Sequence, residues 1–280
     1  MNWERFTYIC RKAKGSLKPD ESISECISRV EREPGCGLYG KRIRDDETTR
    51  YILNDISNMS DRSEAINTLG IYGEIALSTS LFYMVKFGRI IIYLAYITVI
   101  LYVLSLIYQV LVIPSFIETM EIFDFPIPSY LVFFRDYWVF FLVIISIFLL
   151  CSALIGITLK GVFKFRADSV KGFMFRLYSF REIRSSYFKI IDVLYFPVRT
   201  TIDETDSSDM VKHLQAIRRS GMNLSLEIQA LVNIEAQVLL KLCEKKMKII
   251  TLLTTVVVIA AVVCFLFSAY LPIFYIGDAI

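Results

Sequence analysis

Three long stretches of the chain contain no charged residue, and they limit the possible folds more than any other feature. They cover residues 90–113, 137–159 and 249–271. A helix of that length rises about 35 Å, enough to cross a hydrocarbon core of about 30 Å. Buried helices of soluble proteins rarely continue so far without a polar face. We therefore expect three transmembrane helices.

The two longer polar segments, residues 1–89 and 160–248, have the pattern of short helices. In the first, Ile23, Ile27 and Val30 recur on one helical face, and no alternation typical of strands persists. The predicted fold class is all-α: a polytopic membrane protein with three transmembrane helices and two cytoplasmic helical-bundle domains. In this division residues 114–136 form a loop and residues 272–280 form a tail on the other side of the membrane.

Breaks in the apolar pattern predict the individual helices. In the first domain we expect one helix after Pro19 that ends at residues 34–37, one over 46–56, and a helix start within 58–63. In the second, an aromatic-rich helix over 173–196 ends at Pro197, and an acidic connector over 200–209 precedes a helix over 210–219. A last helix over 224–248 is predicted to continue into the third span.

The positions of lysine and arginine predict the orientation. Residues 1–89 contain 14 of them and residues 160–280 contain 16, whereas residues 90–159 contain only Arg135. By the positive-inside rule both polar segments face the cytoplasm, and the loop and the C-terminal tail face the periplasm. The N-terminus has early charges and no apolar core of a signal peptide. Six basic residues flank the spans and are expected to fix the topology, or to contact anionic lipid or a partner: Lys160, Lys164, Arg166, Lys245, Lys246 and Lys248.

The residue inventory argues against several functions. A net charge of +3 is too small to indicate nucleic-acid binding. No phosphate-binding loop motif occurs, and no ionisable residue lies in the spans where a pump would need one. Cys151 and Cys264 have no histidine or carboxylate partner in the spans, and the only histidine is His213. We predict no catalytic residue, no metal site and no cofactor, and we expect the cysteines to be reduced.

The few polar residues in the spans are expected to form interhelical hydrogen bonds or to be tolerated by the packing. Among them are Gln109, Ser146, Ser152, Thr254 and Thr255.

Two of the three spans end in a Pro-x-Phe sequence. Pro114 and Phe116 follow the first span, and Pro272 and Phe274 lie at the end of the third. The two similar endings indicate a duplicated unit of one polar domain and one span. Between the first two spans, a Phe-Pro-Ile-Pro-Ser segment contains Pro126 and Pro128.

These motifs resemble those of the PilC and type II secretion F family of inner-membrane platform proteins. In that family a Val-Pro-x-Phe exit is followed by a Leu-Pro-x-Pro-Thr segment, and the chain ends in a sequence similar to residues 270–280. The match covers residues 90–140 and 240–280, and extends to residues 160–240 by architecture. The family's Gly-Glu-x-x-Gly-x-Leu signature is poorly kept, because Gly73 and Glu74 lack the second glycine.

The resemblance implies a platform in the bacterial inner membrane, in a compact branch such as a type IVb-like or conjugative pilus system. Its implied partners are a cytoplasmic hexameric assembly ATPase, pilin or pseudopilin subunits, other inner-membrane assembly components, the lipid bilayer and a second copy of the chain. The implied function is coupling of the ATPase to extraction and polymerisation of pilins. Two alternatives remain open: a type II secretion F protein acting on pseudopilins, and a membrane adaptor unrelated to pili.

Overall fold

The computed structural model describes residues 2–77, 85–122, 124, 126–127, 129–163, 165, 180–199 and 208–279. These residues are helical apart from turns and short connectors, and they contain no β-strand, which confirms the predicted all-α class. Three of the helices are long and apolar enough to cross a membrane, as predicted.

The chain divides into two compact units. We call residues 1–84 and 158–244 the polar unit, and residues 85–157 and 245–280 the apolar unit. Both predicted cytoplasmic segments thus contribute to one compact unit. The boundaries of the two sequence-based domains stay a prediction.

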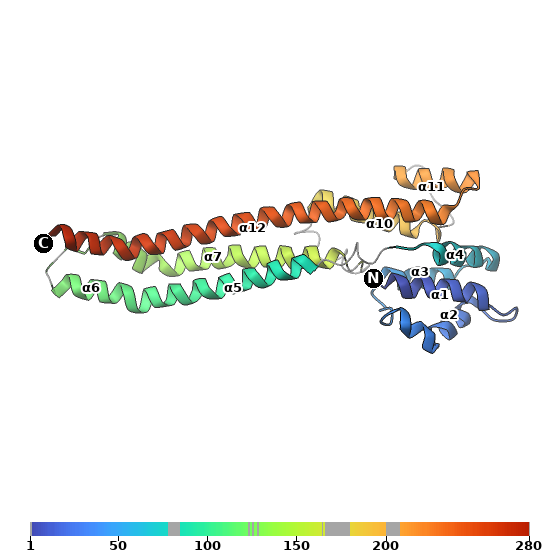
Figure 1. Cartoon of the computed structure of the whole chain (residues 1–280), viewed down its shortest axis with the longest axis horizontal. Helices are drawn as coiled ribbons and strands as arrows, with labels where there is room; N and C mark the ends of the chain where they lie inside the picture. Colours follow the sequence, from blue (N-terminus) through green and yellow to red (C-terminus); the bar gives the residue numbers. More distant parts are fainter. Residues whose placement is uncertain are drawn as a thin grey trace. The chain divides into compact units, whose positions relative to one another are not determined.

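The first part of the polar unit is built on α1. Its elements are α1 (Trp3–Ser16), α2 (Ile23–Arg32), the 3-10 helix η1 (Pro34–Tyr39), α3 (Thr48–Ser57) and α4 (Arg62–Glu74) (Figure 1). The rings of Trp3, Phe6 and Tyr72 pack edge to face or tilted against one another, with no more than 2% of each residue exposed. The Trp3 indole N–H also donates to the Ile75 carbonyl oxygen at 2.9 Å. This cluster joins α1 to the end of α4.

The second part of the polar unit contains α10 (Arg181–Tyr195), α11 (Asp209–Ser220) and the first turns of α12 (Leu224–Ala279). Several hydrogen bonds connect it to the first part. The Tyr72 hydroxyl donates to the Leu194 carbonyl oxygen at 2.6 Å, and the Ala76 amide donates to the Gln229 side-chain oxygen at 3.1 Å. The polar unit is therefore held together by contacts between segments that are far apart in the sequence.

Phe165 makes a further connection within the polar unit. Its carbonyl oxygen accepts hydrogen bonds from the Thr48 amide at 3.2 Å and the Thr48 hydroxyl at 2.7 Å, at the start of α3. Its fully buried ring stacks on Tyr187 of α10, with ring centroids 5.3 Å apart. Phe165 has φ 46°, a left-handed conformation that costs a residue with a side chain about 1–2 kcal/mol. The surrounding contacts must offset that cost.

The start of α2 is fixed by a capping box and an ion pair. Ser22 and Glu25 exchange the two hydrogen bonds of the capping box. One residue earlier, both carboxylate oxygens of Glu21 accept from the Arg29 guanidinium, at 2.8 and 2.9 Å. Arg29 thereby lowers the pKa of Glu21 to about 2.

Substitution of Arg29 by glutamine is expected to raise the pKa of Glu21 towards its ordinary value of about 4.5, because the paired cation is lost. The folded-state pKa lies below the unfolded one, so the pair stabilises the fold above the unfolded pKa and is lost as the pH falls through about 2. A titration of the Glu21 carboxyl by carbon NMR measures this. In the matched variant Arg32→Gln the midpoint should stay near that of the unmodified chain, and an equal rise in both variants would contradict the assignment.

The apolar unit contains α5 (Val85–Ile107), the π-helical turn η3 (Tyr108–Val112), α6 (Ile113–Ile122), most of α7 (Ser129–Val162) and the second half of α12. These segments run alongside one another in Figure 1. Two predicted boundaries are wrong. The first helix does not end at Pro114, because α6 continues from η3 to Ile122, and α12 continues through the predicted tail to Ala279. Most of the predicted loop over 114–136 is therefore helical.

The π-helical turn explains why Pro114 does not end the helix. Proline has no N–H to donate, and in a regular α-helix its ring collides with the carbonyl four residues earlier, here that of Val110. The Ile113 amide instead reaches back five residues to the Tyr108 carbonyl oxygen. This wider turn accommodates the ring and lets the helix continue.

Polar side chains connect α5 and η3 to α7. The Trp138 indole N–H donates to the Ser105 hydroxyl at 2.7 Å, and the Tyr102 and Ser146 hydroxyls share a hydrogen bond. The Gln109 amide donates to the Arg135 carbonyl oxygen at 3.4 Å. Gln109 and Ser146 thus form the predicted interhelical bonds. Ser152, Thr254 and Thr255 instead donate to the carbonyl four residues earlier in their own helix.

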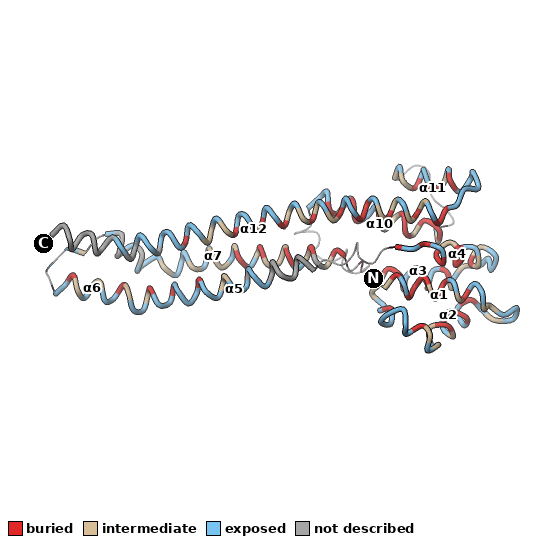
Figure 2. Tube along the Cα trace, in the orientation of Figure 1, coloured by how far each residue is buried: buried red, intermediate tan, exposed pale blue. Residues whose placement is uncertain are grey.

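The buried face of α12 has a regular period. Four buried residues lie 11 positions apart along the helix: Ile228, Leu239, Ile250 and Ala261. Between Ile228 and Ile250, further buried residues follow at steps of three or four positions. This spacing is an 11-residue repeat, which corresponds to about 3.67 residues per turn, close to the 3.6 of a straight α-helix. Buried positions therefore recur along one helix that contributes to both units (Figure 2).

Candidate functional site

The structure does not bring the sequence-predicted motif residues together into a site. Pro114 and Phe116 lie in the first turns of α6, and Pro126 lies in the connector before α7. Pro128 is outside the described residues. The backbone at Pro272 and Phe274 belongs to α12, and their side chains are outside the described part.

The basic residues predicted at the membrane borders also form no common site among the described residues. Lys245 and Lys248 are exposed and Lys246 is half-buried, all on α12 where the apolar unit begins. The backbone of Lys160 is in α7, whereas Lys164 and Arg166 are outside the described residues. Their role at the membrane border stays a prediction.

His213 is not isolated. Its Nε2 atom lies 2.8 Å from a carboxylate oxygen of Glu227, and both side chains are partly exposed. No group of three or more histidine, cysteine, aspartate or glutamate residues could hold a metal ion within the described ranges. Burial raises the pKa of the Cys10 thiol far above its ordinary value, so this thiol is protonated at neutral pH.

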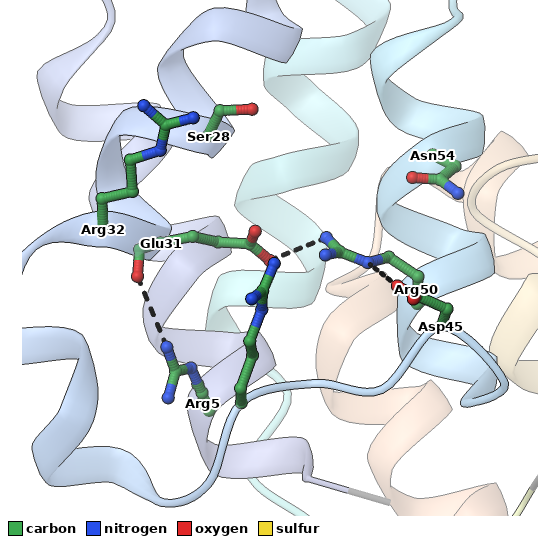
Figure 3. A pocket seen from close by; sticks show the side chains of 8 residues that line it. Arg5, Ser28, Glu31, Arg32, Asp45, Arg50 and Asn54 are labelled. Atoms are coloured by element: carbon green, nitrogen blue, oxygen red, sulfur yellow. Dashed lines mark hydrogen bonds and ion pairs between the residues drawn. The ribbon is translucent and has the colours of Figure 1, made fainter.

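An arginine-lined pocket in the polar unit is the candidate site. Its volume is about 780 Å³, and its lining comes from α1, α2, α3 and the connector before α3. The lining residues are Arg5, Ser28, Glu31, Arg32, Arg42, Asp45, Arg50 and Asn54. Figure 3 shows seven of them labelled, with the Glu31 side chain directed towards Arg50. The lining thus contains four arginines and two acids.

Helix periodicity places these residues on the pocket. In α3, Ile52, Leu53 and Ile56 are buried in the core, which leaves Arg50 and Asn54, four residues apart, on another face. In α2 the core positions include Ile27 and Val30, so Ser28, Glu31 and Arg32 fall outside the core face. The lining residues therefore lie on the polar faces of helices whose apolar faces pack in the core.

Arg50 is the only one of the four arginines with a carboxylate partner among the described residues. Its Nη1 lies 2.8 Å from a carboxylate oxygen of Glu31, and its Nε lies 3.5 Å from one of Asp45. The Asp45 side chain is 98% exposed, so solvent screens its contribution. Glu31 therefore balances the positive charge of one of the four guanidinium groups, that of Arg50.

Arg5 is buried, with 9% of its surface exposed, and its hydrogen bonds go to backbone carbonyls. Its guanidinium donates to the Gly40 oxygen at 3.0 Å and the Glu31 oxygen at 3.4 Å. Gly40 has φ 116°, and a Cβ there would lie 3.0 Å from the Asn2 side chain, so the turn requires glycine. No carboxylate in the described part of the chain forms an ion pair with Arg5.

Arg32 and Arg42 have exposed side chains, and neither makes a hydrogen bond or ion pair with any described residue. Sequence reasoning missed this pocket, because its four arginines are separated by 8 to 27 positions and form no motif. One signal in the sequence pointed to it. Arg32 and Arg50 each lie next to the apolar positions of a predicted helix, and therefore on its polar face.

Comparison of the chain with models of protein families, with curated proteins and with solved structures gave no significant match.

Proposed function

We propose that the protein is an inner-membrane platform of a type IV pilus assembly machine. In this role it couples a cytoplasmic hexameric ATPase to the extraction and stacking of pilin subunits, without hydrolysing ATP itself. Both polar segments face the cytoplasm in this proposal. The motif resemblance around Pro114 and Pro272 suggests the family, and the continuity of the helices suggests the mechanical role.

The observation that carries the proposal is the continuity of α12. Its 56 residues correspond to about 84 Å of helix, and no break separates the polar unit from the third span. The 11-residue series of buried positions continues past Glu244, the last residue of the polar unit. A packed helix transmits a displacement better than a loop, because its backbone hydrogen bonds and side-chain contacts move together.

Two hydrogen bonds within the polar unit lie close in sequence to the other two spans. Ile75, which accepts the Trp3 hydrogen bond, lies ten residues before α5 begins. Phe165, which accepts from Thr48, lies three residues after α7 ends. A platform must pass a movement of its cytoplasmic part to its membrane helices. These contacts support such a role because each fixes a residue of the polar unit that lies within ten positions of a span in the sequence.

Deletion of the gene is expected to abolish surface pili while the pilin remains in the inner membrane. Electron microscopy of the cells and immunoblotting of membrane fractions measure these two quantities, with the complemented strain as the control. Purification of the tagged full-length chain is expected to retain the assembly ATPase. Unchanged pilus assembly in the deletion strain would contradict the proposal.

The same experiment separates the alternatives. If pili are normal but secreted enzymes accumulate in the periplasm, the protein acts in type II secretion on pseudopilins. If neither changes and a different soluble partner copurifies, the protein is a membrane adaptor.

A further inference from the structure

The charge of the arginine-lined pocket is not balanced by the described residues. The lining contains four arginines and two acids, which leaves a net charge of +2. Both acids make their ion pairs with Arg50, so Arg5, Arg32 and Arg42 have no carboxylate partner among the described residues. Like charges around one cavity repel one another, and bound anions remove that repulsion.

Arg5 gives a second and independent indication. Buried charges in proteins are normally paired with an opposite charge. Arg5 is nine-tenths buried, and its described hydrogen bonds go to the uncharged carbonyls of Gly40 and Glu31. These two carbonyls fix the guanidinium at the pocket wall. An anion in the pocket would supply the missing counter-charge.

The chemistry and the size of the pocket indicate the class of anion. Guanidinium groups present planar pairs of donors that match the oxygens of a phosphate. Ser28 and Asn54 add uncharged hydrogen-bonding groups to the same lining. A volume of about 780 Å³ is typical of sites for small organic ligands and exceeds the need of one inorganic phosphate.

We propose that this pocket binds a phosphate-bearing anion of about two negative charges, with Arg5, Arg32 and Arg42 as its cationic ligands. A small soluble diphosphate and a phospholipid head group share this chemistry. The site is separate from the motifs of the proposed pilus function and does not depend on that function.

The test uses the full-length protein in nanodiscs of zwitterionic lipid and sodium pyrophosphate as the soluble probe. Isothermal titration calorimetry is expected to show one site, with affinity that falls as salt is added. In Arg32→Gln/Arg42→Gln the dissociation constant should rise by about 100-fold, because each charge-assisted contact contributes about a factor of ten. These two side chains form no bond with a described residue, so the variant should fold normally.

A matched control removes the same charge from the same region. Lys41→Gln/Arg44→Gln replaces two exposed basic residues of the connector that do not line the pocket. Its dissociation constant should change by less than about threefold, because only the general field of the protein is altered. Thermal unfolding of both double variants verifies that the fold is kept.

A lipid arm identifies the source of the phosphate. Native mass spectrometry counts the phosphatidic acid molecules that the protein retains from mixed nanodiscs. If Arg32→Gln/Arg42→Gln reduces retention of phosphatidic acid and pyrophosphate does not bind, the ligand is a lipid head group. If pyrophosphate binds and the double variant weakens that binding without changing lipid retention, the ligand is a soluble diphosphate. If both double variants behave alike in both arms, or the unmodified protein binds neither probe, the inference is overturned.

Discussion

Substitution of Phe165 by alanine is expected to lower the free energy of unfolding of the polar unit by about 3–5 kcal/mol, the usual cost of removing a buried phenylalanine ring. The ring is fully buried and stacks on Tyr187, and the residue's carbonyl oxygen accepts two hydrogen bonds from Thr48. Hydrogen exchange of the α3 amides in the full-length protein, measured in detergent, reports this loss where it should be largest.

Two further variants separate the ring from the backbone. Phe165→Gly removes the same ring but also removes the steric cost of φ 46°, so it should be no less stable than the alanine variant. Phe188→Ala removes a neighbouring ring of α10 that is 42% exposed, and its cost should stay below about 1 kcal/mol. Equal losses from Phe165→Ala and Phe188→Ala would show that the stacked ring does not hold the polar unit together.

Substitution of Trp3 by alanine is expected to cost a similar amount, about 3–5 kcal/mol. The indole is 2% exposed, packs against Phe6 and Tyr72, and donates to the Ile75 carbonyl oxygen. Protection of the α1 and α4 amides from hydrogen exchange should fall together, because the indole contacts both helices. Loss of protection in α1 alone would contradict this connection.

Trp3→Phe tests the hydrogen bond separately. It keeps most of the apolar packing but leaves the Ile75 carbonyl, among the described residues, with the Thr7 hydroxyl at 3.5 Å, so we expect an intermediate loss of about 1–3 kcal/mol. Trp138→Phe is the matched control, because it alters the other tryptophan of the chain, in the apolar unit, and leaves the polar unit unchanged.

The sequence was most informative where one physical requirement dominates. A span must exclude charge over a length of about 20 residues, so the three spans could be predicted from composition alone. The predicted continuation of residues 224–248 into the third span is confirmed, since α12 runs unbroken from Leu224. No proline or glycine occurs between Leu224 and the end of that span. The helix ends predicted at Pro197 and near residue 219 are also confirmed.

The predictions failed where the outcome depends on local geometry. Proline indicates a helix end at 114 and 272, but a π-helical turn accommodates Pro114, and such a turn has no recognisable sequence pattern. The apolar pattern also does not reveal α1, although Trp3, Phe6 and Ala13 lie on its buried face. The buried face of α1 also includes the charged residue Arg5, and this charge obscures the apolar pattern.

The candidate pocket was beyond sequence reasoning for a different reason. Its residues come from four segments, and only the packing of α1, α2 and α3 brings them to one cavity. Arginines at the surface are ordinarily solvated, so nothing in the sequence singles out Arg5. The burial of its guanidinium against two carbonyls is a property of the tertiary structure.

The 11-residue series of α12 also limits how the length of the chain can change during evolution. Insertion of one residue near Glu244 turns every later side chain by about 100° around the helix axis, which would move Ile250 and Ala261 off the buried face. Gain or loss of one whole repeat restores the phase almost completely. Homologous chains should therefore differ in length within connectors such as the one at 40–47, and should keep the spacing along α12 or change it by whole repeats.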